Sequence, residues 1–545
     1  MTPLSFRWSI SLGVAAAAVS PAMAADGAVV WQRWEHRLTS SVDYANPCAD
    51  VALRVTYDGP GGQRLSTLGF WDGNRTFRLR CAFPEPGTWR WTTECSDGAN
   101  TGLHGQSGAV EVRAYHGTNP LYTHGFLKVS DNRRYLAHAD DTPFLWIGDT
   151  AWAAPMRASA EEWETYLADR AAKHFTVVQV SPASEWAGDR DREGNEPFVD
   201  GDCSRLNPAY WQAFERKIQR ANEEGLAVML VGLMEPSRRY PEAQQACVFA
   251  RNIIARLYGN FVVFSPSFDS PHMDLANEVG RAAREVTSVH LITQHPGTPS
   301  GQPTPIWSDP YYDEPYIDIA GVQTGHNGGN REQCARQAIE WNLHLYSHEP
   351  HKPVINLEAM YDAQGENGWQ AIDARSLGWR SMLSGAMGYT YGAGDVPPKQ
   401  PDGNGAIWKW SSDPDAYDYW EKALQWESST QMRHLHDFLA AIEWWRLEPA
   451  HELILNQPED ITKRMVLAKT PENDLVVAYL PGNEGIELDT SKLRETVAQQ
   501  WFDPVHWSFA PATGLVVARG RTTYPAPTDG DWVLLLSRIT PGGAA

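Results

Sequence analysis

The sequence predicts an α/β protein in which a (β/α)8 TIM barrel is flanked by an N-terminal and a C-terminal β-sandwich. Between residues 143 and 391, short apolar runs alternate with amphipathic stretches, which is typical of parallel α/β domains. Eight such runs occur over roughly 300 residues, the number of strands that this barrel needs. On either side, short alternating strands separated by turn residues indicate antiparallel sandwiches. A doubly wound sheet is the alternative, but no GxGxxG or P-loop motif supports nucleotide binding in one.

The first 24 residues have the pattern of a secretory signal. Arg7 precedes an apolar run at 10–19, and Ala22-Met23-Ala24 matches the small-residue cleavage pattern. No later stretch approaches the roughly 20 apolar residues that a spanning helix needs. We therefore expect a secreted or periplasmic protein without membrane insertion. The expected division is a signal at 1–24, an N-terminal sandwich at 25–120, a barrel at 121–445 and a C-terminal sandwich at 446–545.

Turn and cap residues place the individual elements. In the N-terminal sandwich, strands are expected at 50–57, 64–70, 76–83 and 88–94. The barrel strands are expected at 144–148, 176–181, 227–232, 261–265, 289–293, 317–322, 353–357 and 388–391. A capping box from Ser159 to Glu162 predicts a helix to residue 174, and Asn207-Pro208 predicts one ending at Gly225. Further helices are expected at 330–347 and 374–383, and C-terminal strands at 464–469, 475–480, 499–502, 515–518 and 532–537.

The net charge of the chain limits the classes of molecule that it is expected to bind. A formal net charge of -21 makes nucleic acid and anionic lipid poor partners, whereas neutral and basic ligands stay open. No pattern in the chain indicates an oligomeric state.

Among the six cysteines, Cys203 and Cys247 are the expected disulfide because both lie at loop edges of the third barrel unit. No Cys/His spacing indicates zinc, so no metal or cofactor is expected, and His344 with His348 is interpreted as a solvated or packed helix pair.

Polar and aromatic residues follow most of the predicted barrel strands, where a barrel of this class carries its site. Each of them alone fits an ordinary loop residue or helix cap. Their joint position at the ends of the strands predicts a binding mouth. The expected ligand-holding residues are Asp149, Trp152, Glu185, Trp186, His295, Gln323, His326, Tyr361 and Asp395.

Two of the predicted strands lead to carboxylates. Asp269 follows the fourth strand and Glu358 ends the seventh, so both acids are expected to project from the same rim of a parallel barrel. Glycoside hydrolysis uses such a pair, one protonated at the leaving oxygen and one ionised at the anomeric carbon or its water. A separation of about 5–5.5 Å indicates retention of anomeric configuration, and about 6.5–9.5 Å indicates inversion.

Several short motifs resemble the apiosidase-like glycoside hydrolases of family 140. In the barrel these are Gly148-Asp149-Thr150-Ala151-Trp152, Gln294-His295-Pro296, Gln323-Thr324-Gly325-His326, residues 356–362 and residues 388–392. Residues 44–47 and 69–73 are similar to the β-sandwich that often precedes that barrel, and residues 444–449 and 501–504 to its C-terminal module. The resemblance places the acid/base on Asp269 and the nucleophile on Glu358. The chain departs from the family at Ser267-Phe268-Asp269, usually Gly-Gly-Asp, and at Glu358-Ala359, usually Glu-Pro.

The leading hypothesis is therefore a glycosidase that removes a terminal sugar, apiose or another pentofuranose-like unit, from a plant-type polysaccharide by a retaining mechanism. Phe268 adds bulk beside the expected acid, which motivates a competing hypothesis of a carbohydrate-binding protein that has lost turnover. A third hypothesis is an adhesion protein built on the two sandwiches. The motifs GxSxG and HExxH are absent, so a serine esterase and a zinc protease lack sequence support.

Overall fold

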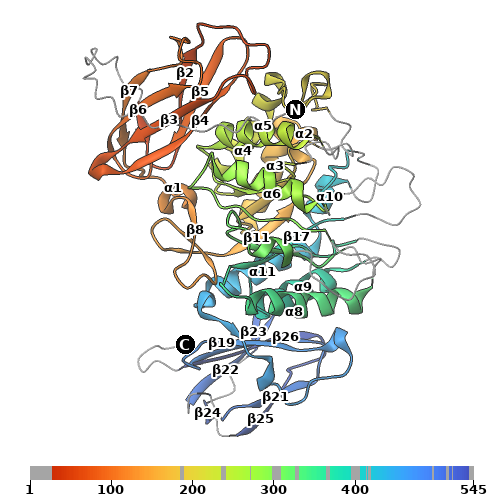
Figure 1. Cartoon of the computed structure of the whole chain (residues 1–545). Coiled ribbons are helices and arrows are strands. Elements are labelled where there is room, and N and C mark those ends of the chain that lie inside the picture. Colours follow the sequence, from red (N-terminus) through yellow and green to blue (C-terminus); the bar gives the residue numbers. More distant parts are fainter. Residues whose placement is uncertain are drawn as a thin grey trace.

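The computed structural model describes residues 27–183, 190–234, 241–270, 272–297, 309–325, 330–363, 369–394, 406–412, 414, 419–491, 493, 496–510, 515–517 and 520–538. Within these ranges, a central parallel sheet and its helices lie between one β region at the N-terminal end and another at the C-terminal end (Figure 1). The expected signal at 1–24 lies outside the described residues. In the described part of the chain, no helix combines the length and hydrophobicity needed to cross a bilayer.

Seven parallel strands form the central sheet in the order β14-β13-β12-β11-β17-β16-β15. They are β11 (Trp146–Thr150), β12 (Val177–Val180), β13 (Ala227–Val231), β14 (Val262–Ser265), β15 (Ala320–Gln323), β16 (Val354–Glu358) and β17 (Ala386–Tyr391). Every residue of these strands is buried, as expected for a parallel sheet covered on both faces. The buried amide of Gln179 on β12 donates to the Leu357 carbonyl on β16 (3.0 Å), which ties together two strands that are not neighbours in the sheet.

The expected strand at 289–293 does not form as a regular strand. Ile292 makes one isolated parallel bridge to Phe264 of β14, and its carbonyl accepts from the Asp318 backbone N–H (2.8 Å). The Ile292 N–H donates to the Asp318 carboxylate (2.8 Å), so a side chain takes the place of a ladder partner. The segment thus bridges the two ends of the sheet, from β14 to the chain just before β15. The sheet and this bridge support a barrel, although eight regular strands are not seen in the described residues.

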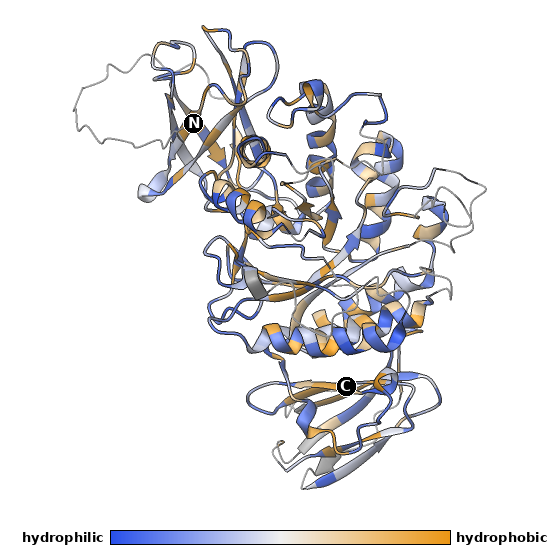
Figure 2. Cartoon of the chain, turned by 45° about the vertical axis from the view of Figure 1, so that its right-hand side comes forward, coloured by the Kyte–Doolittle hydropathy of each residue, from blue (hydrophilic) through white to orange (hydrophobic). Residues whose placement is uncertain are grey.

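Helices pack around this sheet, and the two predicted caps are confirmed. They are α2 (Ala154–Arg157), α3 (Ala160–Ala172), α4 (Pro208–Glu223), α5 (Ala243–Leu257), α6 (Met273–Arg284), α7 (Asp309–Tyr312), α8 (Arg331–Ser347), α9 (Ala371–Leu383), α10 (Trp420–Leu424) and α11 (Glu427–Ala440). Ser159 and Glu162 form the capping box of α3, and Asn207 caps α4 with Pro208 in its first turn. Figure 2 shows that these helices carry both hydrophobic and hydrophilic residues, as amphipathic helices do.

The N-terminal β region is a mainly antiparallel arrangement that bends at β4, with β1 and β7 as a parallel pair. Its strands are β1 (Ala28–Val29), β2 (Arg33–Thr39), β3 (Leu53–Asp58), β4 (Arg64–Trp71), β5 (Thr76–Ala82), β6 (Gly87–Cys95) and β7 (Ser107–Arg113), in the order β1-β7-β6-β3-β4-β5-β2. The first part of β4 pairs with β3, whereas Phe70 and Trp71 at its end pair with β5. This change of partner folds the sheet around its own core, which includes Tyr57 and Trp89.

Helix α1 (Pro120–His124) and a small sheet of β8 (Leu127–Val129), β9 (Leu136–His138) and β10 (Pro143–Phe144) lead into the barrel. The C-terminal region contains β18 (Glu448–Pro449), β19 (Val466–Lys469), β20 (Leu475–Pro481), β21 (Gly485–Asp489), β22 (Thr496–Asp503), β23 (Ser508–Ala510), β24 (Leu515–Val517), β25 (Arg521–Pro525) and β26 (Asp531–Arg538). It packs on the barrel through Arg375 of α9, whose guanidinium makes two hydrogen bonds of 2.7 Å to the buried Asp531 carboxylate.

The predicted Cys203–Cys247 disulfide is wrong. All six cysteines lie in the described part of the chain, and all six are free thiols. Cys203 is buried in the barrel core and Cys247 packs at its edge, so each behaves as a small apolar residue in its own packing site. Burial raises the pKa of the Cys203 thiol to about 12, which keeps it protonated and unreactive.

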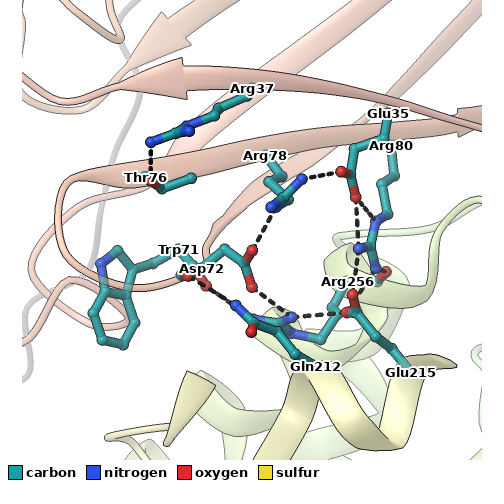
Figure 3. Close-up of polar contacts among 10 residues, drawn as sticks. All are labelled: Glu35, Arg37, Trp71, Asp72, Thr76, Arg78, Arg80, Gln212, Glu215 and Arg256. Atoms are coloured by element: carbon teal, nitrogen blue, oxygen red, sulfur yellow. Dashed lines mark hydrogen bonds and ion pairs between the residues drawn. The ribbon is translucent and has the colours of Figure 1, made fainter. Parts of the chain in front are cut away.

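A buried network of three arginines and three carboxylates joins the N-terminal β region to the barrel (Figure 3). Its members are Glu35, Asp72, Arg78 and Arg80 on one side and Glu215 and Arg256 on the other. Arg80 of β5 makes a bidentate contact with Glu215 of α4 (2.6 and 2.8 Å). Arg256 of α5 donates to both Glu215 and Asp72 (2.7 and 2.9 Å). Both of these guanidinium groups also lie against the Phe70 ring, at 4.7 and 4.4 Å from its centroid.

Replacing Glu215 by Gln should destabilise the protein by about 3–5 kcal/mol, because it leaves two buried arginines short of a counter-charge. Burial raises the pKa of Glu215, but the charges of Arg256 and Arg80 outweigh burial and lower it to about 2. The stability that the ionised Glu215 contributes is therefore present above pH 4.5, the pKa of a glutamate in the unfolded chain. It is lost as the pH falls toward 2, the pKa of Glu215 in the folded protein. Denaturant unfolding at pH 7 and pH 3 measures both effects. The control is Arg64→Ala at the exposed Arg64–Asp58 pair, which should change stability by less than about 1 kcal/mol.

Candidate active site

Asp269 and Glu358 lie together at the carboxyl end of the parallel sheet. Glu358 is the last residue of β16, and Asp269 follows β14 by four residues. Since the strands are parallel, these two positions share one rim. One carboxylate oxygen of each acid and one ring nitrogen of His295 lie within 4.8 Å of one another. The structure therefore brings together the two acids that the sequence singled out.

His295 stands between the two acids. Its Nδ1 lies 3.2 Å from Asp269 Oδ1 and its Nε2 lies 3.3 Å from Glu358 Oε2. The imidazole is fully buried, Glu358 is 3% exposed, and Asp269 is 32% exposed. Burial lowers the pKa of His295, but the contact with Asp269 and the charges of both carboxylates outweigh burial and raise it above 6.5. Both ring nitrogens thus face acceptors, and the arrangement favours a protonated ring.

Both carboxylate oxygens of Glu358 are held by amide or hydroxyl donors. Gln323 Nε2 donates to Oε2 (2.7 Å), and the Tyr361 hydroxyl donates to Oε1. Burial and the adjacent Glu358 charge raise the pKa of Tyr361, so this hydroxyl stays protonated. Trp152 Nε1 donates in turn to the Tyr361 oxygen (3.0 Å). These contacts fix the orientation of Glu358 and favour its ionised form.

A register shift places the Gln323 donor. Along the β15–β16 pair, Val322 aligns with Asn356 and Gln323 with Glu358, so Leu357 has no partner. Such irregularities re-aim side chains beside functional sites. Here the shift brings the Gln323 amide opposite the glutamate that ends β16. The bulge is the local reason why Gln323 reaches Glu358.

The turn that carries Asp269 is attached to the segment that carries His295. Phe268 makes a parallel bridge to His295, and the Asp269 N–H donates to the His295 carbonyl (3.1 Å). Asp269 has a φ of +53°, a left-handed conformation that aspartate tolerates better than most residues. Strained backbone of this kind is concentrated at active sites.

Phe268 does not crowd the open side of Asp269. Its side chain is buried, and its ring packs on Trp152 (4.5 Å between centroids) and perpendicular to His295 (5.4 Å). Trp152 also packs edge-on against His295 (5.3 Å). The bulky ring beside the acid therefore packs against the imidazole and leaves Asp269 partly exposed.

The remaining predicted residues divide into two groups. Asp149 is not brought to the site: it is fully buried and points to α3, where Arg170 Nε (2.6 Å) and the Tyr166 hydroxyl (2.7 Å) donate to its carboxylate. A ligand contact for Asp149 is thus contradicted, because strand residues alternate in direction and this one faces the helix layer. The others, Glu185, Trp186, His326 and Asp395, lie outside the described residues.

Two features of the site were missed from the sequence. Gln294 accepts from the Ser267 N–H (3.1 Å), which anchors the turn before Asp269, although the motif around His295 could have suggested it. Trp408 is half-buried beside Tyr361 (6.4 Å between ring centroids), and its carbonyl accepts from the Ala153 N–H (3.0 Å). One tryptophan among 24 carries no positional signal, so only the fold could select it.

The site has the parts needed for proton transfer to a ligand and for attack by a carboxylate. Glu358 is buried, oriented and surrounded by donors, whereas Asp269 is more open to solvent. A metal ion held by all three residues would need one ring nitrogen that faces both acids. Here Nδ1 faces Asp269 and Nε2 faces Glu358, an arrangement suited to proton sharing.

Comparisons with known proteins cover almost all of the described chain. Residues 130–446 match the family model "Apiosidase-like, catalytic domain". Residues 28–96 match "Domain of unknown function (DUF5060)", and residues 449–537 match "Putative collagen-binding domain of a collagenase". No match is found among the curated proteins.

Solved structures share the fold at low sequence identity. One, described as a "putative glycoside hydrolase" from Bacteroides vulgatus ATCC 8482, is 18% identical with a TM-score of 0.71, over 94% of this chain and 100% of that one. Another, described as a glycoside hydrolase, is 21% identical with a TM-score of 0.66, over 78% and 99%. A family 5 glycoside hydrolase from the same Bacteroides strain is 20% identical with a TM-score of 0.65, over 78% and 96%.

Replacing Glu358 by Gln should lower the pKa of His295, because the substitution removes one of the two negative charges that raise it. Histidine-selective NMR titration of the wild type and the variant measures this pKa. His138, whose pKa is lowered by burial, serves as an internal control and should titrate identically in both proteins. An unchanged or higher pKa for His295 in the variant would show that the imidazole does not interact with Glu358.

Proposed function

The chain belongs to the apiosidase-like family of glycoside hydrolases, and we propose that it removes a terminal sugar, apiose or another pentofuranose-like unit, from a plant-type polysaccharide or glycoside. As a glycoside hydrolase, it acts on a carbohydrate substrate. The residue pattern at 1–24 supports action outside the cytoplasm, in a secreted or periplasmic form.

The single observation that carries the mechanism is the pair of carboxylates around His295. In this proposal Glu358, held by Tyr361 and Gln323, attacks the anomeric carbon and forms a covalent glycosyl ester while the leaving oxygen takes a proton from Asp269. Water, deprotonated by Asp269, then cleaves the ester and releases the sugar. The greater burial of Glu358 and the greater exposure of Asp269 support these separate roles.

The separation of the two acids supports retention of anomeric configuration. Their closest oxygens lie within 4.8 Å. This is nearer to the roughly 5–5.5 Å typical of retaining enzymes than to the about 6.5–9.5 Å that leaves room for an attacking water. It also supports turnover rather than sugar binding alone, because a binding site needs no second carboxylate at this spacing.

His295 provides the proton that the pair needs. Two ionised carboxylates so close together repel each other, and a protonated imidazole between them offsets that repulsion. Its Nδ1 faces Asp269 at 3.2 Å, so Asp269 can take the proton of His295 and pass it to the leaving oxygen, which leaves Asp269 ionised and able to deprotonate the water of the second step. His295 is thereby a positioning and proton-holding residue rather than a contact for sugar hydroxyls.

The neighbouring aromatic ring of Trp408 is placed to contact the sugar. It lies half-buried next to Tyr361, and an apolar sugar face stacks well on an indole ring.

We assign the barrel to the (β/α)8 class, with the segment around Ile292 in place of the fifth strand, and the flanking regions at 25–120 and 446–545 to β-sandwiches.

Replacing Glu358 by Gln should abolish hydrolysis, and replacing Asp269 by Asn should slow it about 10²–10⁴-fold on a natural glycoside. On a dinitrophenyl pentofuranoside the Asp269→Asn variant should keep most of its kcat/KM, because that leaving group departs without a proton, while kcat should fall because hydrolysis of the ester still needs Asp269 as a base. Initial rates on branched pectins and aryl pentofuranosides measure both effects, and identification of the product gives the released sugar. The matched control is Glu340→Gln, an exposed carboxylate on α8, which should keep full activity.

Full activity of Glu358→Gln on a cleavable substrate would remove this mechanism. Glycan binding by the wild type in calorimetry, without product after long incubation, would instead favour the non-catalytic carbohydrate-binding protein. Binding that survives deletion of the barrel would favour an adhesion role for the flanking regions.

Replacing Tyr361 by Phe should lower kcat about 10- to 100-fold with little change in KM, because Glu358 Oε1 loses its hydroxyl donor. The phenyl ring keeps the packing against Trp408, but the buried Trp152 N–H loses its acceptor, so thermal unfolding should show a loss of about 1–3 kcal/mol in stability. Steady-state kinetics with the substrate identified above measures both constants. An unchanged kcat would show that the hydroxyl does not support the nucleophile.

A further inference from the structure

Two histidines and an aspartate form a cluster on the barrel surface. His174 follows α3, and His436 and Asp437 lie on α11. The Nδ1 atoms of both rings contact the same oxygen, Asp437 Oδ1, at 2.9 Å for His436. The two rings lie edge to face with 5.3 Å between centroids, and one donor atom from each of the three residues lies within 4.8 Å of the others.

The backbone at His174 has a conformation that few non-glycine residues adopt. Its φ is +58°, the left-handed conformation that glycine normally supplies after a helix. The turn is a regular helix end in other respects, since the His174 N–H donates to the Ala171 carbonyl (3.0 Å) and the Phe175 N–H to the Arg170 carbonyl (3.0 Å). A histidine at this position costs conformational energy that glycine would avoid, so its imidazole calls for a separate explanation.

We propose that His174, His436 and Asp437 bind a zinc ion, or a divalent transition metal of similar chemistry. Two imidazole nitrogens and one carboxylate oxygen are a common ligand set for zinc, with water in the fourth position. In a tetrahedral site, ligand atoms lie about 3.3–3.4 Å apart. The contacts between the two histidine Nδ1 atoms and Asp437 Oδ1 need to lengthen by less than about 1 Å to reach this spacing. The ion would then replace the protons that these atoms share.

The surroundings fit an accessible metal site. The His174 side chain is 44% exposed, which gives an entry path and room for a water ligand, while His436 and Asp437 are 18% and 19% exposed. Arg433 Nε contacts the other carboxylate oxygen, Asp437 Oδ2 (3.2 Å), and thereby turns Oδ1 toward the histidines.

The position of the cluster indicates a structural role. His174 lies just before β12, at the amino end of the parallel strands, whereas the acids of the candidate active site lie at their carboxyl end. The metal would join two segments 263 residues apart in the chain, α3 at the start of the barrel and α11 at its end. Closing so long a loop stabilises the folded state without a part in catalysis.

The test is zinc titration of the metal-free full chain by calorimetry and by thermal unfolding, comparing the wild type with His174→Gly. In zinc-free buffer the variant should unfold within about 2 °C of the wild type, because glycine relieves the strained backbone. Zinc should raise the wild-type midpoint by at least about 2 °C, and magnesium should not. His174→Gly should bind zinc at least about tenfold more weakly and lose the rise. His436→Gln should also lose it.

Two further variants separate this cluster from other donors. His344→Ala alters the helix pair on α8 and should keep the wild-type zinc response. Glu358→Gln alters the candidate active site and should keep it as well. A zinc response that His174→Gly retains, or that only Glu358→Gln removes, would place the ion elsewhere and overturn the proposal. So would a wild type that shows no zinc response at all.

Discussion

The contact between the buried His295 imidazole and two carboxylates is the constraint around which the candidate active site is built. Two negative charges within 4.8 Å repel by about 3.5 kcal/mol at an effective dielectric constant of about 20. A protonated ring between them offsets this cost and fixes both acids. The surrounding features serve the same contact: Trp152 and Phe268 pack on the ring, and the bulge before Gln323 supplies Glu358 with a donor.

Much of the fold followed from local signals in the sequence. Seven of the eight expected barrel strands form, and the capping box at Ser159 forms as predicted, because hydrophobic periodicity and cap chemistry act over a few residues. The expected strand at 289–293 does not form because the Ile292 N–H donates to the Asp318 side chain instead of to a neighbouring strand. That contact joins residues 26 positions apart, so local patterns do not reveal it. The expected disulfide failed for a similar reason, since loop position does not reveal whether two thiols meet.

The site was predictable to the extent that strand ends determine which residues share a rim. That rule placed Asp269, His295, Gln323, Glu358 and Tyr361 at one rim, and in the structure they are in contact with one another there. It could not tell which side of a strand faces the mouth, so Asp149 was misplaced: its carboxylate pairs with Arg170 on the helix layer. It also could not find His174 and His436, whose proximity depends on two helices far apart in the chain.

The most direct test of Glu358 as the nucleophile is to trap the covalent intermediate. The wild type would be incubated with an activated 2-deoxy-2-fluoro pentofuranoside, which slows hydrolysis of a glycosyl ester, and then analysed by intact mass and peptide mapping. Nucleophilic attack by Glu358 predicts one sugar adduct per chain, on the peptide that contains Glu358. A substrate that is turned over without any adduct, or an adduct on Asp269 or another carboxylate, would contradict it.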